Sequence, residues 1–292
     1  MTSLGSISDR IREPEILSLF ENGHRQQAAE AVENRIEEAR ASGGPALFQA
    51  LELRGDLAFC MADPVKATQA YEEALGVLPA NSSRLEPSLR ARVLGNLADL
   101  YDRLGREAEA SEHFERAVEL YLKVTPHPIE ILATLKNNLG LLYKNSGNFD
   151  QSETCYIEAA NYFDSLHGEN SEEVADVLNN LGGLYAMAGF DEQAQSTYER
   201  ALRVRQVLHA GGHTDVGQTQ GNLAVFHANL GQEEQAQTYF VNALKTLKKH
   251  PGDGEELEIV VGNYQAWLES LGRDPQADAA LAKARKALAA LG

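Results

Sequence analysis

The chain has little of what stabilises secreted or membrane proteins. Its 292 residues include two cysteines, Cys60 and Cys155, which lie far apart in the chain and predict no disulfide framework. We expect Cys155 to be a small core residue of a helix. No apolar run approaches the roughly 20 residues that cross a bilayer, and residues 1–12 lack the layout of a signal peptide. These absences predict a cytoplasmic protein with no transmembrane segment.

Basic residues are also few. The chain has 26 Lys and Arg residues against 43 Asp and Glu residues, which leaves a net charge of −17. Such a chain repels a phosphate backbone, so nucleic acid is not an expected partner. The charge is expected to keep an extended surface in solution, with a dedicated acidic docking patch as the alternative. Three basic clusters are expected to be solvated helix faces: Arg90 with Arg92 and Arg103, Arg200 with Arg203 and Arg205, and Lys245 with Lys248 and Lys249.

Sequence signatures of catalysis are absent as well. The chain contains no Gly-x-x-x-x-Gly-Lys phosphate loop, no Gly-x-Ser-x-Gly elbow and no His-Glu-x-x-His helix. We therefore expect neither enzymatic activity nor a cofactor. His209, His213 and Asp215 are able in principle to share a metal ion. Their connector offers no second pair of ligands for a closed zinc shell, so no metal site is expected.

What the chain has is a repeat with a period of 42 residues. Four glycines mark it, Gly105, Gly147, Gly189 and Gly231, and their neighbours fall into one register. Before each glycine the chain has a leucine, a small residue and an aromatic residue. After each glycine it has a small residue, an aromatic residue and an alanine. The last unit has His227 at the first aromatic position, where we expect a packed core imidazole. A fixed period of this length indicates a helical repeat array.

One unit shows why the pattern predicts paired helices. Residues 175–188 carry apolar side chains at steps of three and four, which indicates a helix. A second helix follows, in which Ala194 and Ala201 flank Tyr198. The alanines are expected to let the partner helix approach while the tyrosine ring fills the space between them, and Gly182 supplies the matching flat position. One pair buries too little apolar surface to be stable alone, so stacked pairs are expected to share a core.

The array is expected to continue more weakly towards both ends of the chain. Residues 1–45 predict a degenerate first unit, residues 46–249 the core repeats, and residues 250–292 a C-terminal capping unit. In the unit before Gly105, residues 62–64 (Ala-Asp-Pro) replace the glycine turn. Strong helix formers dominate the composition. We therefore predict one all-α solenoid domain of about seven helix pairs over residues 1–292.

Helix pairs with this small, aromatic, small signature resemble tetratricopeptide repeats. The 42-residue period exceeds the roughly 34 residues of the ordinary unit and resembles the kinesin light chain variety. The segment 175–208, ADVLNNLGGLYAMAGFDEQAQSTYERALRVRQVL, is similar to that family's characteristic unit. The connectors 166–170 and 208–213 resemble its Leu-Gly-x-x-His-Pro link without the proline. The resemblance implies a right-handed superhelical solenoid that binds proteins and performs no catalysis.

The resemblance also narrows the expected partners. About a dozen residues precede the first predicted helix, too few for the coiled coil with which kinesin light chains hold the motor chain. Motor binding is therefore not expected, and the chain resembles the stand-alone bacterial members of the family, some of which accompany bacterial tubulins. This implies a filament of bacterial-tubulin type as partner. Two alternatives stay open: an adaptor that captures an extended cargo or chaperone peptide in the concave groove, and a repeat array that changes pitch when it senses a ligand.

The family resemblance places the first helix of each pair on the concave surface. Five consecutive units carry asparagine at one position of that helix: Asn96, Asn138, Asn180, Asn222 and Asn263. A carboxamide both donates and accepts, so this asparagine ladder is expected to grip the backbone of an extended partner. The alternative is that each asparagine bonds a neighbouring helix and fixes the stacking. The residues expected beside the ladder are Asn137, Asn179, Leu141, Lys144, Met187, Val225, Asn229 and Arg92, the last resembling part of the carboxylate clamp of chaperone-binding repeats.

Overall fold

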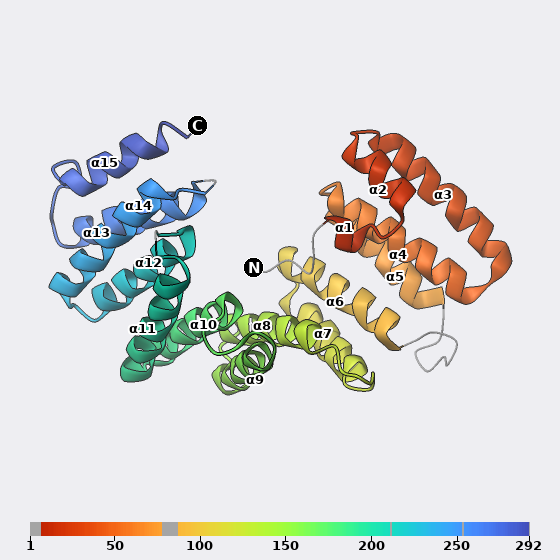
Figure 1. Ribbon diagram of the computed structural model, residues 1–292, viewed down its shortest axis with the longest axis horizontal. Coiled ribbons are helices and arrows are strands. Elements are labelled where there is room, and N and C mark those ends of the chain that lie inside the picture. The colour runs from red at the N-terminus through yellow and green to blue at the C-terminus, as the bar shows by residue number, and fades with distance from the viewer. Residues whose placement is uncertain (1–6, 78–86, 211, 253, 292) are drawn as a thin grey trace. The chain divides into compact units, whose positions relative to one another are not determined.

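The computed structural model describes residues 7–77, 87–210, 212–252 and 254–291. These residues form α-helices joined by turns and contain no β-strand (Figure 1). Within them, seven successive helix pairs follow a short first helix, as the repeat predicts. The chain forms two compact parts, an N-terminal half (Met1–Cys155) and a C-terminal half (Tyr156–Gly292), which divide within one long helix.

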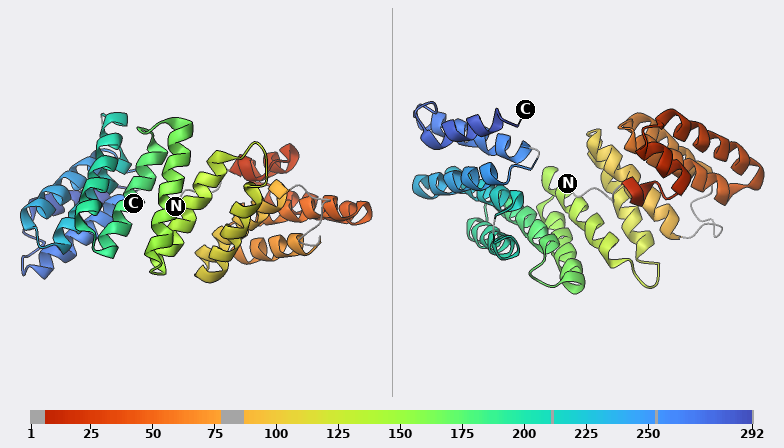
Figure 2. Two further views of the ribbon diagram at one scale, coloured as in Figure 1. Left: turned by 90° about the horizontal axis from the view of Figure 1, so that it is seen from below. Right: turned by 45° about the horizontal axis from the view of Figure 1, so that its top comes forward.

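Each half is built from consecutive pairs. The helices of the N-terminal half are α1 (Ile7–Arg10), α2 (Pro14–Glu21), α3 (Arg25–Ser42), α4 (Gly44–Cys60), α5 (Pro64–Val77), α6 (Pro87–Arg103), α7 (Glu107–Tyr121), α8 (Ile129–Asn145) and the start of α9 (Phe149–His167). The C-terminal half holds the rest of α9 and α10 (Glu172–Ala188), α11 (Asp191–Leu208), α12 (Thr214–Asn229), α13 (Glu233–Lys249), α14 (Glu255–Ser270) and α15 (Ala279–Leu288). Within each half, paired helices such as α6 and α7 or α10 and α11 run antiparallel and pack together (Figures 1 and 2).

A residue in the left-handed conformation ends the first helix of the repeats. Gly189 follows α10 with φ 79°, and its N–H donates to the carbonyl oxygen of Ala186. Gly105, Gly147 and Gly231 take the same conformation, with φ 71°, 77° and 69°. A Cβ makes this conformation costly, which explains the glycines. Ala62 adopts it with φ 58° between α4 and α5, so residues 62–64 do replace the glycine turn.

The close contact predicted between paired helices is present. Ala194 and Ala201 are fully buried on α11, and Tyr198 between them is buried against Gly182 of α10. In the N-terminal half, a Cβ on Gly55 would clash with the ring of Tyr71. Glycine therefore stands where the partner's aromatic ring leaves no room for a side chain.

The aromatic position of the first helix reaches back to the preceding pair. In the N-terminal half, Tyr101 on α6 donates to Glu72 on α5 at 2.6 Å, and Tyr143 on α8 donates to Glu115 on α7. Burial, together with the Glu72 carboxylate, raises the pKa of Tyr101 to about 12. Each tyrosine thus joins two successive pairs while its ring contributes to the core.

His227 occupies the same position on α12 and is packed as predicted. Its side chain is 3% exposed, and its ring stacks on Tyr239 of α13 with 5.3 Å between centroids. The Nδ1 atom is hydrogen-bonded to Gln232. The imidazole therefore replaces tyrosine as a core ring with a satisfied polar atom.

The two cysteines are placed as the sequence indicates. Cys155 is buried on α9, Cys60 is half-buried at the end of α4, and neither is in a disulfide. None of the helices that the structure describes is long and apolar enough to cross a membrane.

Candidate protein-binding surface

The first member of the asparagine ladder is buried. Asn96 on α6 has 5% of its surface exposed. Its amide nitrogen donates to Asp56 on α4 and to the Tyr71 hydroxyl on α5, each at 3.3 Å. Here the side chain joins helices of two successive pairs, which is the arrangement that the stacking alternative predicts.

Another ladder member also bonds a neighbouring helix. Asn222 on α12 donates to the Oδ1 atom of Asn179 on α10 at 3.0 Å. Asn179 is buried, whereas Asn222 is half-buried. The two amides therefore link the first helices of successive pairs in the C-terminal half, and solvent still reaches Asn222.

The remaining residues of the predicted surface differ in exposure. Met187, Asn229 and Asn263 are exposed on α10, α12 and α14. Asn138, Leu141, Lys144, Asn180 and Val225 are half-buried, and Asn137 is buried. Burial lowers the pKa of Lys144. The partner-binding surface stays a prediction, and its most accessible residues lie in the C-terminal half.

Arg92 is engaged within the chain. Its Nε and Nη2 atoms donate to the two carboxylate oxygens of Glu52 at 2.5 and 2.6 Å. Glu52 on α4 is buried, so the pair combines a bidentate geometry with low solvent access. A partner's carboxylate would have to compete with Glu52 for this guanidinium.

A buried polar cluster surrounds this pair, and the sequence did not reveal it. Asp56 accepts a hydrogen bond from the Tyr71 hydroxyl at 2.6 Å and is 6% exposed. Burial raises the pKa of Asp56 to about 7, although the hydrogen bond from Tyr71 acts in the opposite direction. The only available signal was the presence of Glu52 and Asp56 among apolar neighbours on one helix.

Arg10 lies beside the cluster and is buried. Its guanidinium is buried 3.7 Å above the ring of Phe59, and Nη2 lies 3.8 Å from the Asp99 carboxylate. Among the described residues, none of the three guanidinium nitrogens has a hydrogen-bond partner. A cavity of about 590 Å³, lined by side chains of α3, α4 and α6, opens next to it. The cation is held by the aromatic face and by the surrounding carboxylates.

Two of the predicted basic clusters contain a buried arginine, which corrects the expectation of solvated faces. Arg205 on α11 is 1% exposed and donates to Glu172, Thr219 and the carbonyl oxygen of Asp215 at 3.1, 2.6 and 2.9 Å. It also pairs with Asp176. Arg90 is buried on α6. The planar guanidinium suits such multiple pairing, and charge patterning along one helix does not reveal partners on others.

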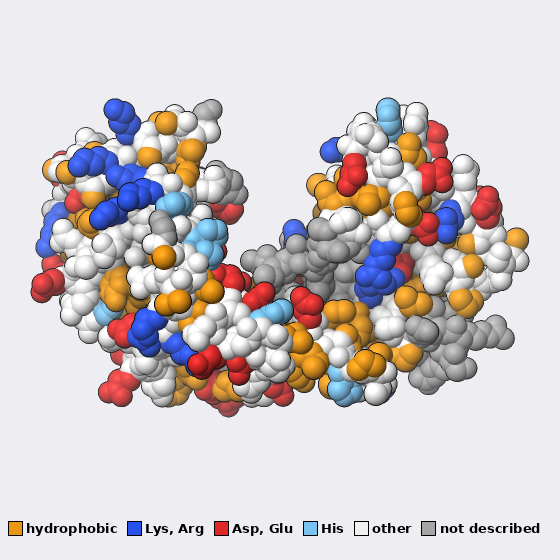
Figure 3. Space-filling view, viewed as in Figure 1, with side chains coloured by type: hydrophobic (Ala, Val, Ile, Leu, Met, Phe, Trp, Pro, Cys, Tyr) orange, Lys and Arg blue, Asp and Glu red, His pale blue; other side chains and the backbone are white. Residues whose placement is uncertain are grey.

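Two lysines of the third cluster are exposed, and the third, Lys248, is half-buried. Lys245 and Lys249 are exposed on α13, and Lys283 and Lys286 are exposed on the adjacent α15. In the space-filling view, Lys and Arg side chains gather over α13 to α15 (Figure 3). Among the described residues, none of these four lysines forms an ion pair. The C-terminal half therefore presents a local positive surface on a strongly acidic chain.

Comparison with known proteins agrees with this architecture. Tetratricopeptide repeat models match residues 91–123 and 131–207. The crystal structure of BtubC (BKLC) from P. vanneervenii is 30% identical, covers 85% of this chain and 93% of that chain, and has a TM-score of 0.63. The chain belongs to the kinesin-light-chain-like tetratricopeptide repeat proteins. This confirms the predicted fold class and family.

Two further members of that group are more distant. Protein KINESIN LIGHT CHAIN-RELATED 2 of Arabidopsis thaliana is 29% identical over 116 residues, which are 39% of this chain and 17% of that protein. The matched region thus spans about a sixth of that relative's length. A putative kinesin light chain of Podosopora anserina shares the fold, with 17% identity, 70% and 99% coverage and a TM-score of 0.55. The kinesin-light-chain-like fold supports a role as a protein-interaction scaffold.

Proposed function

We propose that the chain is a protein-binding scaffold that attaches to a filament of bacterial-tubulin type. The observation that carries the proposal is the match to BtubC, which extends over 85% of this chain at 30% identity. A match of that extent includes helix pairs from both halves. Several successive pairs are therefore available to contact a repeating partner.

The lysines of α13 and α15 support an electrostatic contribution. With a net charge of −17 the whole chain is repelled by an acidic lattice, so attraction has to come from a local basic surface. The exposed Lys245, Lys249, Lys283 and Lys286 form such a surface. Exposed charges are screened by salt, so binding through them weakens as ionic strength rises.

Co-sedimentation with polymerised bacterial tubulin tests the proposal. We expect the chain to pellet with polymer at low salt and to saturate at a fixed ratio. Free subunits should bind far more weakly, because adjacent subunits in a polymer raise the effective concentration for the second contact. An absence of co-sedimentation at low salt would rule the filament out.

A charge reversal on the basic surface locates the contact. Lys245→Glu should weaken binding to polymer about 2- to 5-fold at low salt and less at high salt. Lys123 is exposed in the N-terminal half, so Lys123→Glu makes the same charge change as a matched control. Equal losses for both variants would indicate a net-charge effect and would exclude a lysine contact on α13.

A peptide-binding adaptor is the second candidate, favoured by the exposed Met187, Asn229 and Asn263 of the predicted surface. Apolar and carboxamide side chains together suit an extended peptide, whose backbone needs donors and acceptors. A synthetic peptide of the tubulin C-terminal tail distinguishes the two functions by fluorescence anisotropy. Equal affinity for peptide and polymer supports the adaptor, whereas affinity for polymer alone supports the filament scaffold.

A further inference from the structure

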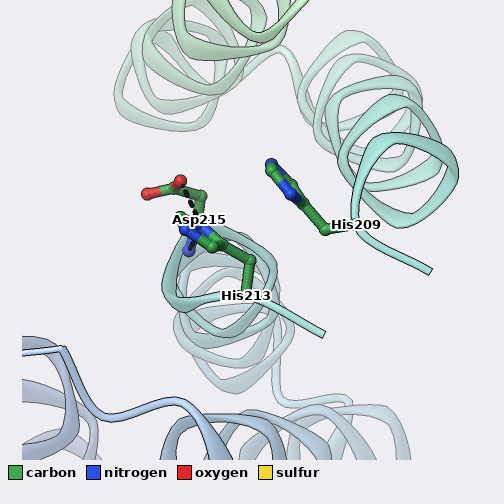
Figure 4. Close-up of side chains that lie close together, drawn as sticks. All are labelled: His209, His213 and Asp215. Carbon is green, nitrogen blue, oxygen red and sulfur yellow. Dashed lines mark hydrogen bonds and ion pairs between the residues drawn. The ribbon is translucent and has the colours of Figure 1, made fainter. Parts of the chain in front are cut away.

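Two histidines and a carboxylate that the protein-binding function does not use come together between α11 and α12. His209 is the C-terminal cap of α11, and His213 is the N-terminal cap of α12, where its Nδ1 accepts from the N–H of Asp215. One donor atom from each of His209, His213 and Asp215 lies within 4.8 Å of the others (Figure 4). The imidazole rings stack with 4.3 Å between centroids, and His213 Nδ1 lies 2.7 Å from an Asp215 carboxylate oxygen.

We propose that His209, His213 and Asp215, together with Glu172 of α10, bind a divalent transition-metal ion of the Zn²⁺ type. Imidazole nitrogens and carboxylate oxygens are the ligands that such ions take, and a closed zinc shell needs four of them. This site is independent of the filament-binding proposal.

Glu172 supplies the ligand that the connector itself lacks. Its Oε2 atom lies 2.8 Å from His209 Nε2, although the two residues are 37 positions apart. Donors around a tetrahedral ion at 2.0–2.2 Å stand about 3.3 Å apart. The His209–Glu172 and His213–Asp215 atom pairs, at 2.8 and 2.7 Å, are therefore close enough to share an ion. Binding of one ion by all four residues requires the side chains, including the stacked imidazoles, to rotate.

Two features hold these donors in place. The buried Arg205 donates to the other carboxylate oxygen of Glu172 and to the backbone carbonyl of Asp215, which fixes α10 against the first turn of α12. Gly212 has φ 95°, and a Cβ there would lie 2.9 Å from the ring of His250. Arg205 therefore holds Glu172 and the first turn of α12 in place before an ion binds.

The negative charge of the cluster favours a cation, and its exposure lets a cation reach it from solution. Two carboxylates face two imidazoles, so the donor set has a net negative charge when the histidines are neutral, which is the form that binds metal. The four side chains are between 29% and 49% exposed. An ion can therefore enter without opening the helix pairs.

Isothermal titration of ZnCl₂ into the full chain, without an affinity tag and after treatment with a chelator, tests the site. We expect one ion per chain and a rise in melting temperature with zinc, because the ion binds the folded form. Cobalt(II) as a probe should give visible d–d absorption bands with the intensity of a four-coordinate site. Non-saturable zinc binding without a thermal shift would overturn the proposal.

Substitutions of the proposed residues test which of them bind the zinc ion. His209→Gln with His213→Gln should weaken zinc binding by about 10-fold or more, and Glu172→Gln should weaken it as well. His167→Gln changes an exposed histidine on α9 and should leave the affinity unchanged. Circular dichroism in the absence of metal checks that each variant is folded. Wild-type affinity in the double variant, or an equal loss in His167→Gln, would contradict the assignment.

Discussion

The ring of Tyr198 lies 2.8 Å from the point where a Cβ on Gly182 would stand. Real Cβ atoms do not approach an aromatic carbon so closely, so Gly182→Ala has to push α10 and α11 apart. We expect a loss of about 1–3 kcal/mol of stability from overpacking, measured by chemical denaturation.

The same substitution at Gly262 should raise the stability of the chain. Gly262 lies in the middle of α14, is exposed, and has open space where its Cβ would be. Gly262→Ala should stabilise the chain by about 0.5–1 kcal/mol, because alanine loses less backbone entropy in a helix. A stabilising effect of both variants would contradict the close contact at Gly182.

Arg205 and Arg203 lie on one helix and should respond differently to truncation. Arg205→Ala leaves the carboxylates of Glu172 and Asp176 without their buried cation, and we expect a loss of about 3–5 kcal/mol. The Arg203 side chain is 65% exposed and pairs with the neighbouring Glu199, so Arg203→Ala should change stability by less than about 0.5 kcal/mol. Thermal and urea denaturation of both variants checks the difference, and similar losses would indicate that Arg205 is not buried.

The buried Asp56 should make stability depend on pH. Its pKa is raised to about 7 in the folded chain, so the folded form holds the proton more tightly than the unfolded form. The stability that protonated Asp56 contributes is complete below pH 4 and is lost as pH rises towards 7. Asp56→Asn, which can still accept from Tyr71, should match the wild type near pH 4 and exceed it at pH 8, by up to about 4 kcal/mol.

Urea denaturation at intervals from pH 4 to pH 8 measures this effect. Asp164→Asn, an exposed change on α9, provides the baseline. A constant difference between Asp56→Asn and the wild type across that range would show that Asp56 ionises normally.

The asparagine ladder should separate into stacking and binding positions. Asn222→Ala with Asn263→Ala changes a half-buried and an exposed position, and should weaken partner binding by about 1–3 kcal/mol by leaving partner backbone groups unpaired. Asn96→Ala breaks two buried hydrogen bonds and should lower the melting temperature with the affinity retained. Co-sedimentation and thermal denaturation of the same samples test both parts. Unchanged affinity in the double variant would assign the ladder to stacking.

The paired helices could be predicted because their signals are local and repeated. The glycine turns, the Tyr198 contact and the packed His227 all follow from one register. The start of α10 could not be placed from apolar spacing alone. Ser171 caps the helix by accepting from the N–H of Val174, so the helix begins at Glu172, three residues before the predicted segment.

Long-range polar contacts account for most of what the sequence left undetermined. Arg205 was predicted to be solvated because it follows other arginines, yet its partners come from α10 and α12. Glu172 stands beside His209 because α10 and α11 run antiparallel, which brings the start of α10 next to the end of α11. A one-dimensional charge pattern carries no information on such pairings, which depend on the register between helices.

Helices of the C-terminal half contact their neighbours along the chain, so this half should unfold locally from its end. From α10 to α15, the principal contacts join helices that are next, or next but one, along the chain. No long-range contact of the kind found in a globular core locks the last pair to the first within these described helices. Amide hydrogen exchange should therefore be graded along the chain, fastest in α15 and slower inwards, and not uniform across the half.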